Sequence, residues 1–221
     1  LALGKEVGEE IRRRHEAAGI TFHLGQSLTE TYGDGRVEGV VLTDGTRLPA
    51  DLLLETVGSV SNTGWLEGND LDLQNGVLTD EHLRAGGRPG VVVVGDVARF
   101  ANPLFAAPAL RIEHWQTAVD TAVFASATLM FDLGLADNEP DPASILPWFW
   151  SDQGDVRLTS YGQLGLADSI EVIDGDLTDE AAIRYTRDGE PVGVLLIGMK
   201  TRAARFKRDL VQARRALQPT A

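Results

Sequence analysis

Cysteine is absent from this 221-residue chain. Its absence excludes disulfides, a thiolate nucleophile, cysteine-bound zinc and iron–sulfur ligation within these residues. The four histidines, His15, His23, His82 and His114, are scattered without the spacing of metal ligands. We therefore expect no metal site in the chain.

Long apolar runs are also missing. No stretch approaches the ~20 residues that a membrane-spanning helix needs, and the N-terminal residues become charged too early for a signal peptide. We therefore expect a cytoplasmic protein that has no membrane partner. The chain does not begin with Met, so we expect it to be part of a longer protein.

Positive charge is scarce: 20 Lys and Arg stand against 33 Asp and Glu, a net charge of −13. This balance argues against nucleic acid as a main partner, because phosphate backbones bind basic surfaces. Basic residues nevertheless gather between Lys200 and Arg215, where Asp209 is the only acidic residue. This stretch could steer an acidic partner or form a solvated helix face, and both interpretations are open.

Signatures of common catalytic sites are absent too. The chain contains no Gly-x-Ser-x-Gly, no His-Glu-x-x-His, no phosphate-binding loop and no Gly-x-Gly-x-x-Gly fingerprint. Residues 174–178 resemble a calcium loop only superficially, because its glycine and its terminal glutamate are lacking, so they indicate an acidic turn. No side chain is assigned as a catalytic nucleophile or base.

The most informative stretch that is present spans residues 90–100. The run Val91–Val94 is β-branched throughout, which predicts a strand buried on both faces. Gly95 ends the run and Asp96 follows, beyond the strand end where ligands bind in open α/β sheets. Asp96 could accept hydrogen bonds from ligand hydroxyls, or it could only start a turn or cap a helix, and this stretch alone leaves both open.

Hydrophobic periodicity predicts the remaining elements. Helices are expected over residues 5–18, 113–130 and 201–217. Strands are expected over residues 20–24, 37–42, 52–57, 77–79, 156–163, 169–174, 181–186 and 192–197. Glu55 would be buried in one of them and would need a partner. Residues 135–147 hold three prolines and three acidic residues, which indicates a linker, and the strands after it indicate a meander in a separate α+β module.

Aromatic side chains follow this linker. Trp148, Phe149 and Trp150 are consecutive, and Trp115 stands at the head of the predicted helix 113–130. Tryptophan usually packs, so a core or an interdomain seam is the simplest interpretation. Three consecutive aromatic residues cannot all point the same way, however. At least one should lie at a boundary with a domain, a ligand or a partner.

Taken in order, four motifs resemble the FAD-dependent ferredoxin reductases. They are Gly-Asp-Val-Ala-Arg (95–99), Asn-Pro-Leu-Phe (102–105), Arg-Ile-Glu-His-Trp (111–115) and Pro-Trp-Phe-Trp-Ser-Asp-Gln (147–153), and the match extends upstream through 57–67 and 75–80. The resemblance implies a NAD(P)H-using flavoprotein enzyme that feeds electrons to a [2Fe–2S] ferredoxin of a cytochrome P450 or ring-hydroxylating dioxygenase system. It implies hydride transfer from the nicotinamide to FAD, followed by single-electron transfer to the partner.

The resemblance also implies six cofactor-binding residues, which are Gly95, Asp96, Val97, His114, Trp115 and Trp150. Asp96 would hydrogen-bond the ribityl or phosphate region of FAD, and Gly95 would let the backbone approach closely. Trp115, at a helix N-terminus that favours negative charge on the reduced flavin, would meet the pyrimidine end of the isoalloxazine. Trp150 would lie near the flavin edge and the ferredoxin-docking surface.

The implied fold is α/β, with a partial FAD/NAD(P)-binding Rossmann-like region followed by a C-terminal α+β interface domain. The expected parts are 1–74 (end of the NAD-binding domain), 75–134 (returning segment of the FAD-binding domain), 135–147 (linker) and 148–221 (interface domain).

The chain departs from the family pattern in three respects. Both glycine fingerprints are missing, Ser61 stands where the family usually has proline, and Glu55 replaces a small or apolar residue. The alternative is therefore a non-catalytic interaction or dimerisation module that does not bind FAD by itself. We expect the isolated chain to be inactive, and a homodimer stays open.

Overall fold

The structure is a computed structural model that describes residues 3–217. The chain divides into two compact units, Ile11–Ser59 and a larger unit made of the residues on either side. Helix α1 (Lys5–Ala17) matches the helix predicted over 5–18. Within residues 3–217, no helix combines the length and the apolar character needed to cross a membrane.

The smaller unit contains a three-stranded antiparallel sheet. Its strands are β1 (Leu28–Tyr32), β2 (Gly39–Leu42) and β3 (Arg47–Pro49), and they are hydrogen-bonded in that order. The turns that bracket residues 37–42 in the sequence therefore predicted this meander correctly.

Two predicted strands of this part, 20–24 and 52–57, are not formed. Leu52 and Val57 are 74% and 85% exposed, and Glu55 is exposed rather than buried. An apolar run becomes a buried strand only beside another strand. Among the described residues, neither run is hydrogen-bonded to a partner strand, and this explains why the prediction was wrong.

The larger unit begins with a small three-stranded sheet. β4 (Val77–Leu78) runs parallel to β5 (Ala98–Phe100), and β5 is antiparallel to β6 (Leu110–Arg111). Three short 3-10 helices lie between or beside these strands, namely η1 (Gly64–Leu66), η2 (Gly95–Val97) and η3 (Pro103–Phe105).

The valine run Val91–Val94 is not the buried strand that the sequence predicts. Val91 and Val94 are 52% and 38% exposed, and only Val93 is as little as 9% exposed. The amide of Val93 donates to the carbonyl of Leu83, in a loop, at 2.9 Å. β-branched residues favour extended backbone, but a regular strand also requires a neighbouring strand. Here the neighbouring segment is a loop, so no regular strand forms.

Helix α2 (Trp115–Asp132) matches the predicted helix 113–130, yet its apolar side is not its buried side. The buried residues are Thr117, Thr121, Ala125 and Thr128. Trp115, Val119 and Val123 are 82%, 48% and 64% exposed. A helix of a globular protein normally turns its apolar stripe toward a core, so α2 presents an apolar surface that the described residues leave uncovered.

Residues 135–147 have no regular secondary structure, as expected of a linker, but they are anchored by burial. Ala143 and Ile145 are 1% and 2% exposed and share an apolar core with Ala125 of α2. The side chain of Asn102 donates to the Ile145 carbonyl at 2.6 Å and accepts from its amide at 3.3 Å. The expected domain bounds stay a prediction.

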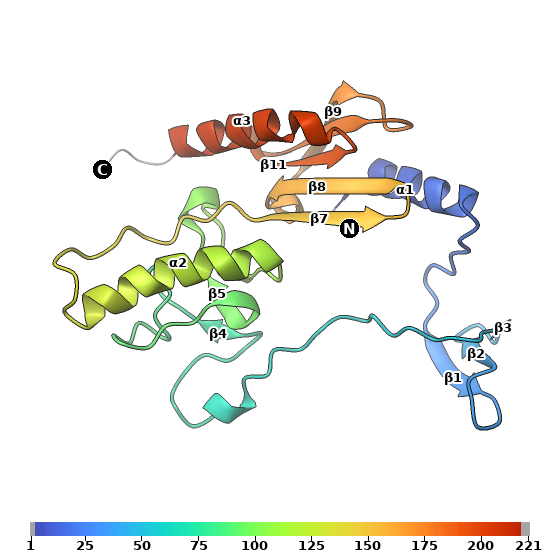
Figure 1. Ribbon diagram of the computed structural model, residues 1–221, viewed down its shortest axis with the longest axis horizontal. Coiled ribbons are helices and arrows are strands. Elements are labelled where there is room, and N and C mark those ends of the chain that lie inside the picture. Colours follow the sequence, from blue (N-terminus) through green and yellow to red (C-terminus); the bar gives the residue numbers. More distant parts are fainter. Residues whose placement is uncertain (1–2, 218–221) are drawn as a thin grey trace. The chain divides into compact units, whose positions relative to one another are not determined.

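The C-terminal region is a five-stranded antiparallel sheet with one helix along it (Figure 1). Its elements are β7 (Trp148–Gln153), β8 (Val156–Gly162), β9 (Ser169–Gly175), β10 (Ala181–Arg187), β11 (Glu190–Ile197) and α3 (Ala203–Ala216). The strand order is β7-β8-β11-β10-β9. A meander pairs each strand with the next strand in sequence. This holds for β9, β10 and β11, but β8 pairs with β11 instead of β9, so the prediction is wrong there. β7 was not predicted, because its second half is polar.

Apolar residues fill this region on both faces of the sheet. On one face, Phe206 and Leu210 of α3 pack with Val194 of β11. On the other, Ile183 and Leu195 are fully buried. The helix predicted over residues 201–217 is thus confirmed as α3, and the region has a core of its own.

Candidate functional site

The turn η2 passes directly beside α2. Gly95 has a φ of +68°, a left-handed conformation that glycine adopts without steric cost. A Cβ at this position would also lie 3.4 Å from the Cβ of Ala118. Glycine therefore allows the backbone to approach the helix, and the next residue, Asp96, remains exposed.

Two side chains hold this turn from opposite ends. The amide of Gly95 donates to Oγ1 of Thr121 at 3.0 Å, and Arg111 donates from Nη1 to the Asp96 carbonyl at 2.8 Å. Arg111 is itself fixed by Glu113 at 2.6 Å and by Asn75 at 3.0 Å. The backbone of Asp96 is thus restrained while its carboxylate faces outward.

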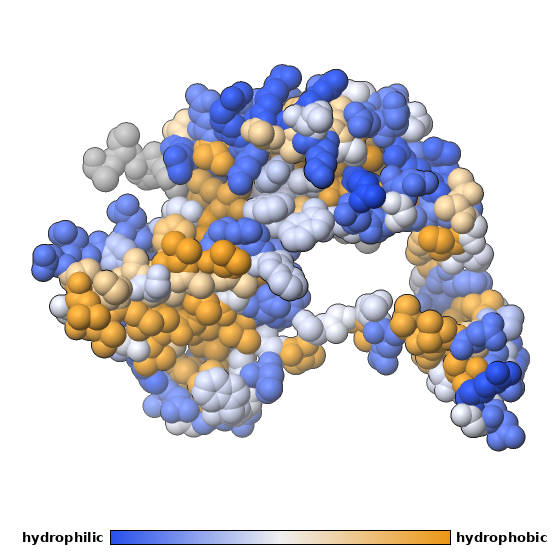
Figure 2. Space-filling model, viewed as in Figure 1, coloured by the Kyte–Doolittle hydropathy of each residue, from blue (hydrophilic) through white to orange (hydrophobic). Residues whose placement is uncertain are grey.

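A cavity of about 960 Å³ lies between η2 and the exposed side of α2. Asp96 and Glu113 give it acidic groups, whereas Trp115, Val119 and Val123 form an apolar wall. Figure 2 shows the hydrophobic side chains gathered over α2. Such a contiguous apolar surface beside a few fixed polar groups is typical of a ligand or partner site.

His114 stands immediately before α2 and connects it to β7. Its ring centroid lies 5.1 Å from that of Phe149, and its Nδ1 is buried without a hydrogen-bond partner in the described part of the chain. Burial lowers the pKa of His114, although the negative charge of Asp96 acts in the opposite direction. The imidazole is therefore neutral near pH 7, since the ordinary pKa of histidine is 6.5 and burial lowers it further.

The aromatic residues of β7 form a second group. Trp148 stacks on Tyr161 at a centroid distance of 6.0 Å and lies 5.4 Å from Trp150. Nζ of Lys207, on α3, lies 5.8 Å from the Trp148 ring. Trp150 is 52% exposed, so one of the three consecutive aromatic residues is available for contact, and its place at a boundary with a ligand or partner stays a prediction.

The structure brings most of the expected site residues together. Asp96, Val97 and Trp115 line the cavity, and Gly95 and His114 adjoin it. Trp150 is not among the lining residues. Sequence reasoning missed the hydroxyl and guanidinium groups that hold η2, although the recurrence of threonine at helical spacing in α2, at positions 117, 121 and 128, was a readable signal.

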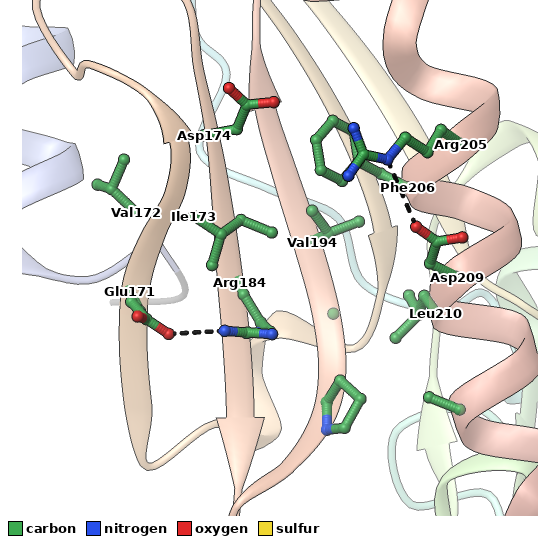
Figure 3. A pocket seen from close by; sticks show the side chains of 13 residues that line it. Glu171, Val172, Ile173, Asp174, Arg184, Val194, Arg205, Phe206, Asp209 and Leu210 are labelled. Carbon is green, nitrogen blue, oxygen red and sulfur yellow. Dashed lines mark hydrogen bonds and ion pairs between the residues drawn. The ribbon is translucent and has the colours of Figure 1, made fainter.

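A second cavity, of about 530 Å³, lies between the sheet strands β9 to β11 and α3 (Figure 3). Its charged groups pair along each wall: Arg184 binds Glu171 at 2.8 Å on the sheet, and Arg205 lies 3.8 Å from Asp209 on the helix. Because these charges are already paired, this cavity is a weaker candidate for chemistry.

Metal binding finds no support in residues 3–217, where no group of three or more acidic or histidine side chains could hold an ion. The segment that resembles a calcium loop is a turn: Asp176 accepts hydrogen bonds from the amide and the hydroxyl of Thr178 at 2.8 and 2.6 Å. The prediction of an acidic turn is confirmed.

The first cavity fits one side of a flavin. A flat aromatic ring system can lie on the apolar wall, and a polyhydroxyl chain can donate hydrogen bonds to an exposed carboxylate such as that of Asp96. The α2 N-terminus, at Trp115, carries a partial positive charge. These features are compatible with FAD at this surface.

Comparison with known proteins identifies the family. The family model of the pyridine nucleotide-disulphide oxidoreductases matches residues 1–122, and a reductase C-terminal model matches residues 148–221. A ferredoxin reductase subunit of 5,5'-dehydrodivanillate O-demethylase from Sphingobium is 32% identical, over 86% of this chain and 45% of its own length. Putidaredoxin reductase CamA from Pseudomonas putida is 32% identical, over 72% of this chain and 34% of its own length.

Solved structures agree in fold. A ferredoxin reductase from Rhodopseudomonas palustris has a TM-score of 0.76 at 31% identity, covering 88% of this chain and 46% of that one. A covalent putidaredoxin reductase–putidaredoxin complex gives a TM-score of 0.83 at 26% identity, covering 94% and 48%. The chain therefore spans about half the length of the relatives it matches. The expected α/β class, a Rossmann-like region followed by a C-terminal sheet domain, is confirmed, and the chain belongs to the pyridine nucleotide-disulphide oxidoreductase family.

Proposed function

We propose that this chain is part of a flavoprotein reductase that passes electrons from NAD(P)H through FAD to a [2Fe–2S] ferredoxin. The observation that carries the proposal is the cavity at η2, where a restrained acidic residue meets the uncovered apolar side of α2. Membership of the family and the reductase names of the relatives support it. FAD, when bound, supplies two-electron chemistry toward a nicotinamide and one-electron chemistry toward a metal centre.

The chain's own residues would bind and orient the cofactor. Asp96 would accept hydrogen bonds from the ribityl hydroxyls, with Gly95 and Val97 shaping the turn that presents it. Trp115 would cover the ring, and the α2 N-terminus would stabilise negative charge there. His114, neutral near pH 7, would pack beside the site without adding charge. Trp150 would lie toward the docking surface.

The nicotinamide would bind partly to residues 1–74. In this part Glu55 is exposed, so it needs no buried partner and its carboxylate can face solvent or a ligand. We propose a cytoplasmic location, in keeping with the sequence prediction, and a homodimer stays a prediction as well.

The partner would be an acidic ferredoxin. Lys207, Arg208 and Arg215 line a shallow cavity of about 590 Å³ along α3, a basic surface that could steer a negatively charged protein. The covalent complex of a similar reductase with putidaredoxin supports a ferredoxin as the partner class. A solvated helix face is the competing interpretation.

The test is to purify the gene product that contains this chain and to measure its flavin content and its NAD(P)H-dependent reduction of ferricyanide and of a ferredoxin. We expect a yellow protein active with both acceptors. A purified product that holds no flavin would contradict the proposal.

The alternative, a non-catalytic interaction module, is tested on the 221-residue chain alone. Neither glycine fingerprint lies in this chain, so a pyrophosphate cradle is missing from it, and we expect weak FAD binding and no activity. Flavin that survives dialysis against buffer would argue against the module interpretation.

A further inference from the structure

We propose that Thr121 is a positioning residue of the cofactor site, whose buried hydroxyl holds the Gly95 amide and thereby sets the position of the Asp96 carboxylate. The inference rests on the proposed function, because it assigns a role toward bound FAD. Thr121 itself is fully buried and touches no solvent, so its role is to act through η2.

The hydroxyl of Thr121 uses both of its hydrogen-bonding capacities. It accepts from the Gly95 amide at 3.0 Å and donates to the Thr117 carbonyl at 2.7 Å. The Ala118 carbonyl lies 3.1 Å from the same oxygen, so the single hydroxyl hydrogen points back along the helix and the lone pairs are left for the Gly95 amide. A side chain of the same shape without oxygen would leave the buried amide unpaired.

The geometry of η2 makes this bond important for Asp96. Gly95 is in the left-handed region, with φ of +68°, and many nearby conformations are open to glycine. The Thr121 bond restricts that freedom on the N-terminal side of Asp96, while Arg111 binds the Asp96 carbonyl on its C-terminal side at 2.8 Å. Without the bond from the Gly95 amide to Thr121, the Asp96 carboxylate would sample a wider range of positions.

The same helix offers a matched control. Thr128 is also buried, at 1% exposed, and its hydroxyl donates to the His82 carbonyl at 2.9 Å. It lies seven residues further on, about 10 Å along the helix, and does not line the cavity. Replacing it removes a buried hydrogen bond from a threonine hydroxyl to a distant backbone group, here a carbonyl, and η2 is not among the groups that it binds.

The experiment compares Thr121→Val, Thr121→Ser and Thr128→Val in the flavin-containing gene product. FAD affinity is measured on apoprotein by fluorescence quenching, and the flavin absorption spectrum and two-electron potential are recorded. Hydrogen exchange of a peptide spanning residues 91–100 follows the Gly95 amide. Thermal unfolding reports the stability of each variant.

We expect Thr121→Val to weaken FAD affinity about tenfold, to change the flavin spectrum and to speed exchange at Gly95. Thr121→Ser should restore all three to within about twofold, because its hydroxyl can make the same bonds. Thr128→Val should lower the unfolding temperature by a similar few degrees while leaving FAD affinity unchanged.

Each contrary result has a distinct meaning. If Thr121→Val and Thr128→Val bind FAD equally well, Thr121 is structural only and the proposal is overturned. Fast exchange at Gly95 in the unmutated protein would show that the bond is absent, which also overturns it. A gene product that holds no flavin would refute the proposed function instead, even if Gly95 were protected.

Discussion

The C-terminal sheet region, 148–217, and the region 75–134 are stabilised in different ways. In the first, each strand has a hydrogen-bonded neighbour within the region and apolar side chains fill both faces of the sheet. In the second, the strands are two or three residues long, the long helix buries threonines, and its apolar stripe is exposed. Region 75–134 therefore leaves an apolar surface uncovered, whereas region 148–217 packs the apolar side chains of its sheet and helix into a core of its own.

Buried polar contacts support region 75–134. Arg84 is 7% exposed and binds Asp132, at the end of α2, with Nη2 at 2.8 Å and Nε at 3.1 Å. Asp132 also accepts from the Gly90 amide at 2.8 Å. These contacts fix the C-terminal end of α2 against the segment that holds Arg84 and Gly90.

The largest difference between the regions should appear when apolar side chains are shortened. Leu195 is fully buried in β11, so Leu195→Ala should lower the free energy of unfolding by about 2–5 kcal/mol. Val119 is 48% exposed on α2, so Val119→Ala should lower the free energy of unfolding by less than about 0.5 kcal/mol. Urea unfolding of the two variants in the 221-residue chain checks this. Equal costs would show that the apolar side of α2 is covered in solution.

Acid should affect region 75–134 through Asp132. Hydrogen bonds from Arg84, and secondarily from Gly90, hold the pKa of Asp132 below its ordinary 3.8. The stability from this ionised carboxylate is fully present above about pH 4 and is lost as pH falls through the lower folded-state pKa. Arg84→Met should therefore flatten the decline in stability between pH 4 and pH 2, measured by thermal unfolding.

A control for this experiment lies in region 148–217. Arg157 and Asp152 form an ion pair at 2.7 Å, but their side chains are 61% and 55% exposed. Solvent screens such a pair, so Arg157→Met should leave the acid decline unchanged. If both variants behave alike, burial of the Arg84 contacts has no special role.

The same contrast explains which parts of the fold could be predicted. The strands 156–163, 169–174, 181–186 and 192–197 were predicted closely, because each has a hydrogen-bonded partner strand in the same region. The run Val91–Val94 has a more strongly strand-like composition but pairs with a loop. Periodicity reports what a segment can bury, and it does not report whether a neighbour is present.

The candidate site was predictable to a similar, partial extent. Asp96 and Trp115 were expected from their motifs and do line one cavity. The supporting groups Thr121 and Arg111 were not expected, because a threonine inside a helix gives no sign of which distant amide it will bind. Contacts of this kind depend on tertiary packing, which single-sequence patterns do not carry.

Asp96→Ala separates binding from stability in region 75–134. The side chain is exposed, so unfolding of the chain should change by less than about 0.5 kcal/mol. FAD retention in the flavin-containing gene product should fall about tenfold, as for the loss of a charged hydrogen-bond acceptor. Unchanged FAD retention in Asp96→Ala would remove Asp96 from the site.

The smallest effect is expected on the outer surface of α3. Lys207 lies 5.8 and 5.7 Å from the Trp148 and Tyr161 rings, so Lys207→Gln should change stability by no more than about 1 kcal/mol. If α3 steers an acidic ferredoxin, the same change should lower the association rate about twofold at low salt, and the difference should vanish at high salt. Stopped-flow reduction of a ferredoxin across a salt series measures both effects. Rates that do not vary with salt would show that α3 is a solvated face, and the uncovered side of α2, in region 75–134, would then be the surface to test for contact with a partner.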